Sequence, residues 1–197
     1  MPKIDRRSVV LLLLGVKPDG RIGDGIGGIT RLQKLLYLLE REGGLVETED
    51  GFEFTAHKAG PYSSKLYDDL EFLENLGFLN SEVAAGATDA EAAEVDMLDF
   101  DDLMSESPDV SDPKADDGYL QEDAYEERRF SITPDGTDRI KRLMQSGELK
   151  PVIDGIRKIK SKYGHYSLSD LLYYVYTNYP DMTTESEIKE KVLRRGR

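Results

Sequence analysis

The chain has 197 residues, 39 acidic and 26 basic side chains, a net charge of −13, and neither Cys nor Trp. This length fits one domain, or one domain with an extension. The absence of Cys excludes disulfides, thiolate zinc sites and cysteine nucleophiles, and it fits a cytoplasmic location, where thiols stay reduced.

The negative charge is concentrated in one segment. Residues 81–127 contain 17 acidic residues and one basic residue, Lys114, so this segment carries −16 and the rest of the chain carries +3. The segment is poor in aromatic residues and cannot bury enough apolar surface to offset the entropy of ordering. We therefore expect three parts: a domain formed by 1–80 and 128–148, a mobile acidic insertion at 81–127, and a C-terminal helical extension at 149–197.

The first predicted element is a helix over residues 5–16, with Asp5 as its N-cap. Its apolar run, residues 9–14, follows three basic residues and therefore resembles the start of a signal peptide. The run is only six residues long, whereas a membrane-spanning helix needs about 20, and Lys17 and Asp19 follow it without a cleavage-like site. We predict a buried helix and no membrane association.

Residues 17–28 contain turn residues throughout, and leucines at helical spacing then predict a second helix from Ile29 to Gly43. Phe52 and Phe54 alternate in a short predicted strand over 51–56, and Gly60-Pro61 predicts a turn. A third helix is expected from Ser63 to Gly77, where glycine suits the left-handed residue that ends a helix. A second strand begins at Phe78.

After the insertion, Phe130 and Ile132 predict a third strand. Thr133 and Pro134 suit the N-cap and first position of the next helix, which ends near Gly147. A helix over 150–163 follows. Two capping boxes, Ser167 with Asp170 and Thr184 with Glu187, predict two more helices. These elements indicate an α+β, mostly helical fold: a winged-helix-like domain with a small antiparallel wing and C-terminal helices.

Three sequence blocks resemble a known family. They are residues 29–38 (ITRLQKLLYL), residues 54–79 around Gly60-Pro61-Tyr62-Ser63, and residues 130–136 (FSITPDG). Together they are similar to the YwgA-like group of prokaryotic proteins. More distantly they resemble the Panacea domain of SocA-type antitoxins, which shares a Leu-Gln-Lys-Leu-Leu-Tyr helix and a later Gly-Pro turn. The resemblance implies a regulatory or antitoxin-like role and no known catalytic residues. The acidic insertion and the C-terminal Tyr-Tyr-Val-Tyr run depart from the pattern.

Several motifs have a chemical and a structural interpretation. Residues 23–28 contain G-x-G-x-x-G, which is typical of dinucleotide sites, but no βαβ unit surrounds them, so we favour a turn between helices and expect no cofactor. His57 and His165 have no nucleophile or second base at suggestive spacing. Asp68 and Asp69 fit a solvated helix face better than a carboxylate pair. We therefore expect neither an enzyme nor a metal site.

Basic and hydroxyl side chains around the second and third helices suit phosphate contacts. The first functional hypothesis is a DNA-binding regulator, with the acidic insertion competing in cis for the basic surface. Its predicted nucleic-acid-binding residues are Arg31, Lys34, Lys58, Tyr62, Ser63, Ser64, Lys65, Arg128 and Arg129. The third helix would be the recognition helix, and its acids, Asp68, Asp69, Glu71 and Glu74, would repel the DNA backbone. The alternative is therefore a protein-interaction module that docks this helix on a basic partner.

Six tyrosines lie between residues 163 and 179. We expect them to serve the core and a homodimer interface formed by the C-terminal helices. A stacking platform for single-stranded nucleic acid is the alternative. The basic residues between Arg157 and Lys162 fit either a solvated helix face or a second nucleic-acid patch.

Overall fold

The computed structural model describes residues 4–23, 25–44, 51–84 and 127–195. Most of the predicted acidic insertion and its hypothetical role in cis therefore lie outside the described residues. The described part of the chain has the predicted α+β, mostly helical fold with a small antiparallel sheet.

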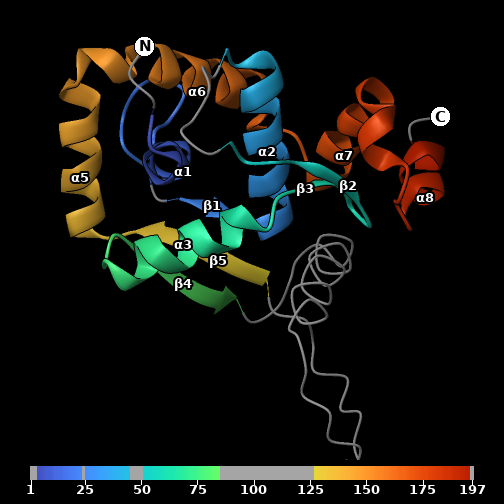
Figure 1. Cartoon of the computed structure of the whole chain (residues 1–197), viewed down its shortest axis with the longest axis horizontal. Helices are drawn as coiled ribbons and strands as arrows, with labels where there is room; N and C mark the ends of the chain where they lie inside the picture. The colour runs from blue at the N-terminus through green and yellow to red at the C-terminus, as the bar shows by residue number, and fades with distance from the viewer. Residues whose placement is uncertain (1–3, 24, 45–50, 85–126, 196–197) are drawn as a thin grey trace, which may run out of the picture.

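The elements follow one another along the chain as helices interrupted by short strands (Figure 1). Their order is α1 (Arg6–Gly15), β1 (Ile26–Gly27), α2 (Ile29–Glu42), β2 (Thr55–His57), β3 (Gly60–Tyr62), α3 (Lys65–Asn75), β4 (Leu79–Ala84), β5 (Glu127–Ile132), α5 (Pro134–Gln145), the 3-10 helix η1 (Gly147–Leu149), α6 (Lys150–Tyr163), α7 (Leu168–Asn178), the 3-10 helix η2 (Pro180–Thr183) and α8 (Lys189–Arg195).

The larger sheet is antiparallel, with the strand order β1-β5-β4. Strands β4 and β5 form the predicted wing, in register from Leu79 opposite Ile132 to Ala84 opposite Glu127. Strand β1 was not expected, because residues 17–28 were predicted as turn throughout. It is only two residues long and is defined by pairing with β5, where Ile26 lies opposite Phe130. The order α1, β1, α2, α3, β4, β5 places the hairpin of β4 and β5 after the third helix, and the winged-helix-like assignment of the domain stays a prediction.

The strand predicted over 51–56 is confirmed only in its last two residues, and the turn predicted at Gly60-Pro61 is wrong. The strand is β2, Thr55–His57, and it forms a hairpin with β3, Gly60–Tyr62, which contains the residues predicted as the turn. Gly60 has a φ of 92°, and a Cβ atom there would lie 3.0 Å from the Tyr176 ring. The hairpin therefore needs glycine at this position to approach α7.

Helix α1 lies at the centre of the molecule, with α2, α3, α5 and α6 around it (Figure 1). Residues 9–14 are at most 1% exposed, as expected for a helix that is apolar on all sides and enclosed by protein. Buried residues of α6 and α7 belong to the same core as those of α1 and α2. The described part of the predicted extension, 149–195, therefore packs as part of the body. No helix in the described ranges has the length and apolarity needed to cross a membrane.

Side-chain caps mark the starts of three of the described helices. Asp5 accepts hydrogen bonds from the backbone N–H groups of Arg7 and Ser8, Thr133 accepts one from Gly136, and Ser167 accepts one from Asp170. The predicted box of Thr184 with Glu187 is wrong, because α8 begins only at Lys189. The Glu187 N–H instead donates to the Lys58 carbonyl, 3.0 Å away, so a tertiary contact replaces the cap.

Candidate interaction surface

Two of the three blocks behind the family resemblance meet inside the protein. The Gln33 side chain of α2 and the Ser63 backbone exchange two hydrogen bonds: Ser63 N–H donates to Gln33 Oε1 at 3.0 Å, and Gln33 Nε2 donates to the Ser63 carbonyl at 3.1 Å. From the next residue of α2, Lys34 Nζ donates to the Pro61 carbonyl at 3.1 Å. We call these three bonds the α2–hairpin lock. They fix α2 to the chain that enters α3.

The lock overturns the predicted surface position of three candidate DNA contacts. Lys34, Tyr62 and Ser63 are buried, and Lys34 is fully inaccessible. The Ser63 hydroxyl donates to the Phe52 carbonyl, and the Tyr62 ring stacks on His57 with the ring centroids 4.5 Å apart. In this conformation the three side chains serve internal packing, and a phosphate backbone cannot reach them.

The other six predicted contacts are half-buried or exposed. Arg31 is half-buried and donates to the Tyr166 carbonyl at 2.8 Å, and Lys65 pairs with Glu53 at 2.6 Å. The Lys58 side chain is half-buried, whereas Ser64, Arg128 and Arg129 are exposed. The exposed arginines lie on β5 of the wing, on the sheet strand opposite β4.

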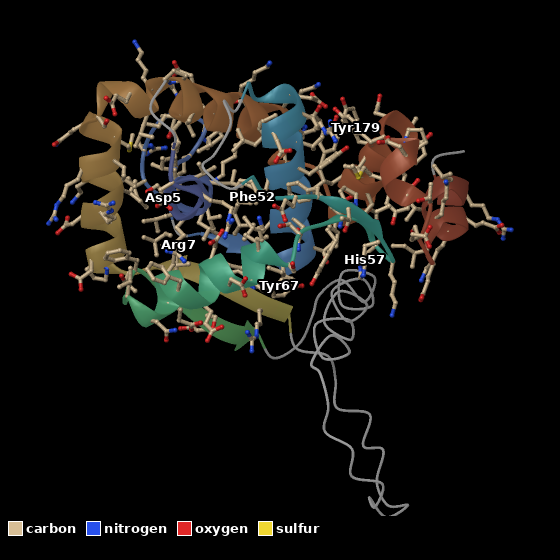
Figure 2. The ribbon with its side chains drawn as sticks, viewed as in Figure 1. Asp5, Arg7, Phe52, His57, Tyr67 and Tyr179 are labelled. Atoms are coloured by element: carbon tan, nitrogen blue, oxygen red, sulfur yellow. The ribbon has the colours of Figure 1, made fainter. Side chains whose placement is uncertain are left out.

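The prediction that Asp69 lies on the solvated face of α3 is also wrong. Its side chain is fully buried and pairs with two arginines of α1, at 2.5 Å from Arg6 Nε to Oδ2 and 3.5 Å from Arg7 Nε to Oδ1. Figure 2 shows Arg7 where α1 and α3 lie against each other. Burial of this carboxylate is tolerated because charged hydrogen-bond donors compensate it. Asp69 therefore joins α3 to α1.

The exposed face of α3 combines acidic and large apolar side chains. Asp68, Glu71 and Glu74 are exposed, and with them Phe72 is 38% and Leu76 is 49% accessible. We call these five residues the α3 face. The Arg7 guanidinium covers one side of the Phe72 ring, 3.7 Å from its centroid. Glu74 also accepts hydrogen bonds from the backbone and hydroxyl of Ser81 on β4, so the wing fixes the end of the helix.

A second polar cluster was not predicted from the sequence. The Glu42 carboxylate, at the end of α2, accepts hydrogen bonds from the hydroxyls of Tyr163, Tyr174 and Tyr179 at 2.6–2.9 Å and from Lys162 Nζ at 3.0 Å. Tyr179 lies beside α2 in Figure 2. Local residue spacing cannot reveal this cluster, because its members come from α2, α6, α7 and the residue that follows α7. We call it the Glu42 cluster.

Hydrogen bonding decides the charge of the Glu42 cluster. Burial alone would raise the pKa of Glu42, but the bonds from Tyr163, Lys162, Tyr179 and Tyr174 outweigh it and lower the pKa to about 2. Burial and the bond to Glu42 raise the pKa of both Tyr163 and Tyr179. The Glu42 carboxylate is thus held ionised and the Tyr163 and Tyr179 phenols neutral, an arrangement that joins helices.

Among the described residues, no three His, Cys, Asp or Glu side chains gather in a way that could hold a metal ion. His57 and His165 lie on different parts of the fold, in β2 and after α6. The structure thus forms two separate groups of side chains, the α3 face and the Glu42 cluster. Of the predicted nucleic-acid-binding residues, it buries three and leaves six half-buried or exposed.

No model of a known protein family and no curated protein sequence matches this chain. The similarity of residues 29–38, 54–79 and 130–136 to the YwgA-like group therefore stays a prediction.

Proposed function

We propose that this chain is a non-enzymatic regulatory protein that binds a basic protein partner through the α3 face. The observation that carries the proposal is the composition of that face, with three exposed carboxylates around Phe72 and Leu76. Exposed apolar side chains with charged residues at their edges are typical of protein-binding surfaces. The carboxylates would favour a basic partner and speed its encounter with the helix.

The same face disfavours insertion of α3 into DNA. In a winged-helix protein that reads DNA, this helix would enter the major groove and approach the phosphates. Asp69 is neutralised by Arg6 and Arg7, but Asp68, Glu71 and Glu74 remain exposed and would be repelled by the backbone. Because Lys34 is buried, one of the basic side chains that the DNA hypothesis requires cannot contact phosphate.

DNA binding through the wing is the second candidate function. Arg128 and Arg129 are exposed on β5, and both can contact phosphate without placing α3 in a groove. This mode would be sequence-independent and strongly dependent on salt concentration.

A salt series separates the two candidates. Fluorescence anisotropy with a non-specific duplex would compare the full chain with the double variant Arg128→Glu, Arg129→Glu. Protein binding as the main function predicts no saturable DNA binding at about 150 mM salt. Saturable binding there that disappears in the wing variant would support the second candidate instead.

A charge reversal on the α3 face tests the first candidate. The double variant Glu71→Lys, Leu76→Lys would be compared with Glu148→Lys, Glu185→Lys, which changes exposed residues of η1 and of the η2–α8 connection. Quantitative affinity capture should retain a protein on the wild type and on the control variant and lose it from the α3 variant. Equal retention by all three chains would contradict a role for this face.

A further inference from the structure

A cleft lies between β1, the start of α2 and the end of α6. Its volume is about 740 Å³, and residues 25–27, Arg31, Lys160, His165 and Tyr166 are among its walls. Sites for small molecules usually occupy about 300–1,000 Å³. The cleft is on a different part of the molecule from the α3 face, so an occupant here is a separate question from the protein partner.

Lys160 brings a desolvated positive charge to the cleft. Its Nζ donates to the Leu14 carbonyl at the end of α1, 3.2 Å away, and no carboxylate of the described residues pairs with it. Burial, together with the nearby charge of Lys17, lowers the pKa of Lys160 to about 8. A partly buried ammonium without a carboxylate partner is unfavourable. An anion in the cleft would relieve that cost.

Arg31 provides a second cation from another helix. Its Nη1 donates to the Tyr166 carbonyl at 2.8 Å, which holds the guanidinium at the wall of the cleft. A guanidinium has five N–H donors in a planar fork that matches phosphate oxygens. None of the described residues that line the cleft is acidic.

The backbone at the floor of the cleft also suits an anion. Gly25 has a φ of 108°, and a Cβ atom there would overlap the Phe130 carbonyl, so the close fit of this segment against β5 requires glycine. Gly25 and Gly27 are both among the residues that line the cleft. Helix α2 begins immediately afterwards, its N-cap Gly28 offers no side-chain cap, and its N-terminus contributes positive potential.

We propose that this cleft binds a phosphate-bearing small molecule of nucleotide size, with Lys160 and Arg31 contacting the phosphate. Two cations from separate helices beside a glycine-rich strand and a helix N-terminus favour phosphate over a single carboxylate. The cleft is larger than one phosphate group. His165 and Tyr166, whose rings meet edge to face at 5.0 Å, offer aromatic surface at its rim for the remainder of the ligand.

Isothermal titration calorimetry on the full chain tests the site with four probes: pyrophosphate, ADP, adenosine and citrate. Saturable binding of ADP and pyrophosphate is expected, with adenosine and citrate weaker by about tenfold or more. Lys160→Met should weaken ADP and pyrophosphate by a similar factor because it removes one charged hydrogen-bond donor. Lys150→Met, an exposed position on the same helix, should leave the affinities unchanged.

Three results would overturn the proposal: no saturable binding of ADP or pyrophosphate, equal affinity of wild type and Lys160→Met, or citrate binding as tightly as pyrophosphate. A circular-dichroism melt checks that the variant folds. A second readout needs no variant. The Cε resonance of Lys160 in the labelled wild type should shift as ADP is added, and an unchanged resonance at saturating ADP would also reject the site.

Discussion

Glu42 shows how one side chain can join three helices. Its carboxylate is 19% exposed and accepts four hydrogen bonds, three of them from tyrosines of α6, α7 and the residue after α7. Hydrogen bonds to a charged group contribute more than neutral ones. A carboxylate with a lowered pKa stabilises the folded state only while it stays ionised.

Glu42→Gln should lower the free energy of unfolding by about 1–2 kcal/mol at pH 7, a value reduced for the partial exposure of the group. The pKa of Glu42 falls from 4.5 to about 2 on folding, so the stabilisation is complete above pH 4.5 and is lost as pH falls to 2. Urea denaturation at several pH values would show the wild type and variant converging in acid. A constant difference across that range, with Glu148→Gln as the exposed control, would contradict the charged role of Glu42.

At the scale of elements, the α2–hairpin lock determines how α3 leaves the hairpin. Gln33 satisfies both backbone groups of Ser63, and Lys34 satisfies the Pro61 carbonyl. All four of these residues are buried, and a hydrogen bond left unmade where water cannot reach is costly.

Gln33→Ala should therefore lower the free energy of unfolding by about 2–3 kcal/mol, because it leaves a buried N–H and a buried C=O of Ser63 without partners. Ser64→Ala, one residue further along and exposed, should change it by about 0.5 kcal/mol or less. Chemical denaturation of both variants measures the difference. Equal effects of the two substitutions would mean that the lock does not hold the hairpin.

Elements whose signals are local could be predicted from the sequence, and those defined by distant partners could not. Thr133 with Pro134 and Ser167 with Asp170 mark helix starts within three residues, and both are confirmed. Strand β1 exists only through its pairing with β5, a hundred residues later. Asp69 appeared solvated by helical spacing because its partners, Arg6 and Arg7, belong to the first helix. The sequence analysis therefore counted Asp69 among the exposed acids of the third helix. The Glu42 cluster was missed for the same reason, because its tyrosines and lysine lie more than a hundred residues from Glu42.

At the scale of the whole molecule, the wing register shows how the acidic segment joins the body. Ala84 and Glu127 face each other as the last pair of β4 and β5, so a two-residue type I′ turn such as Asn-Gly can connect them. The body on both sides of this junction shares a single core that runs from α1 to α8. Folding of the body should not need residues 85–126.

Replacement of residues 85–126 by Asn-Gly should preserve the fold and raise the free energy of unfolding by about 1–2 kcal/mol, because closing a shorter loop costs less entropy. Urea denaturation with far-UV circular dichroism measures both. Loss of cooperative unfolding would contradict the independence of the body.

If the acidic segment competes with DNA for the wing, the variant that lacks residues 85–126 should also bind a non-specific duplex more tightly and with a steeper salt dependence. Unchanged DNA affinity would reject that competition.

The most direct test of the α3 face is a photo-crosslinking amino acid placed at position 76 in the full chain inside the cell of origin. Leu76 is the most exposed large apolar side chain of the face, so a partner docked there must lie within reach of the crosslinker. Our account predicts a crosslinked protein with a basic surface at position 76 and none at position 148, which serves as the exposed control. Crosslinks to nucleic acid at position 129 with no protein at position 76 would contradict it.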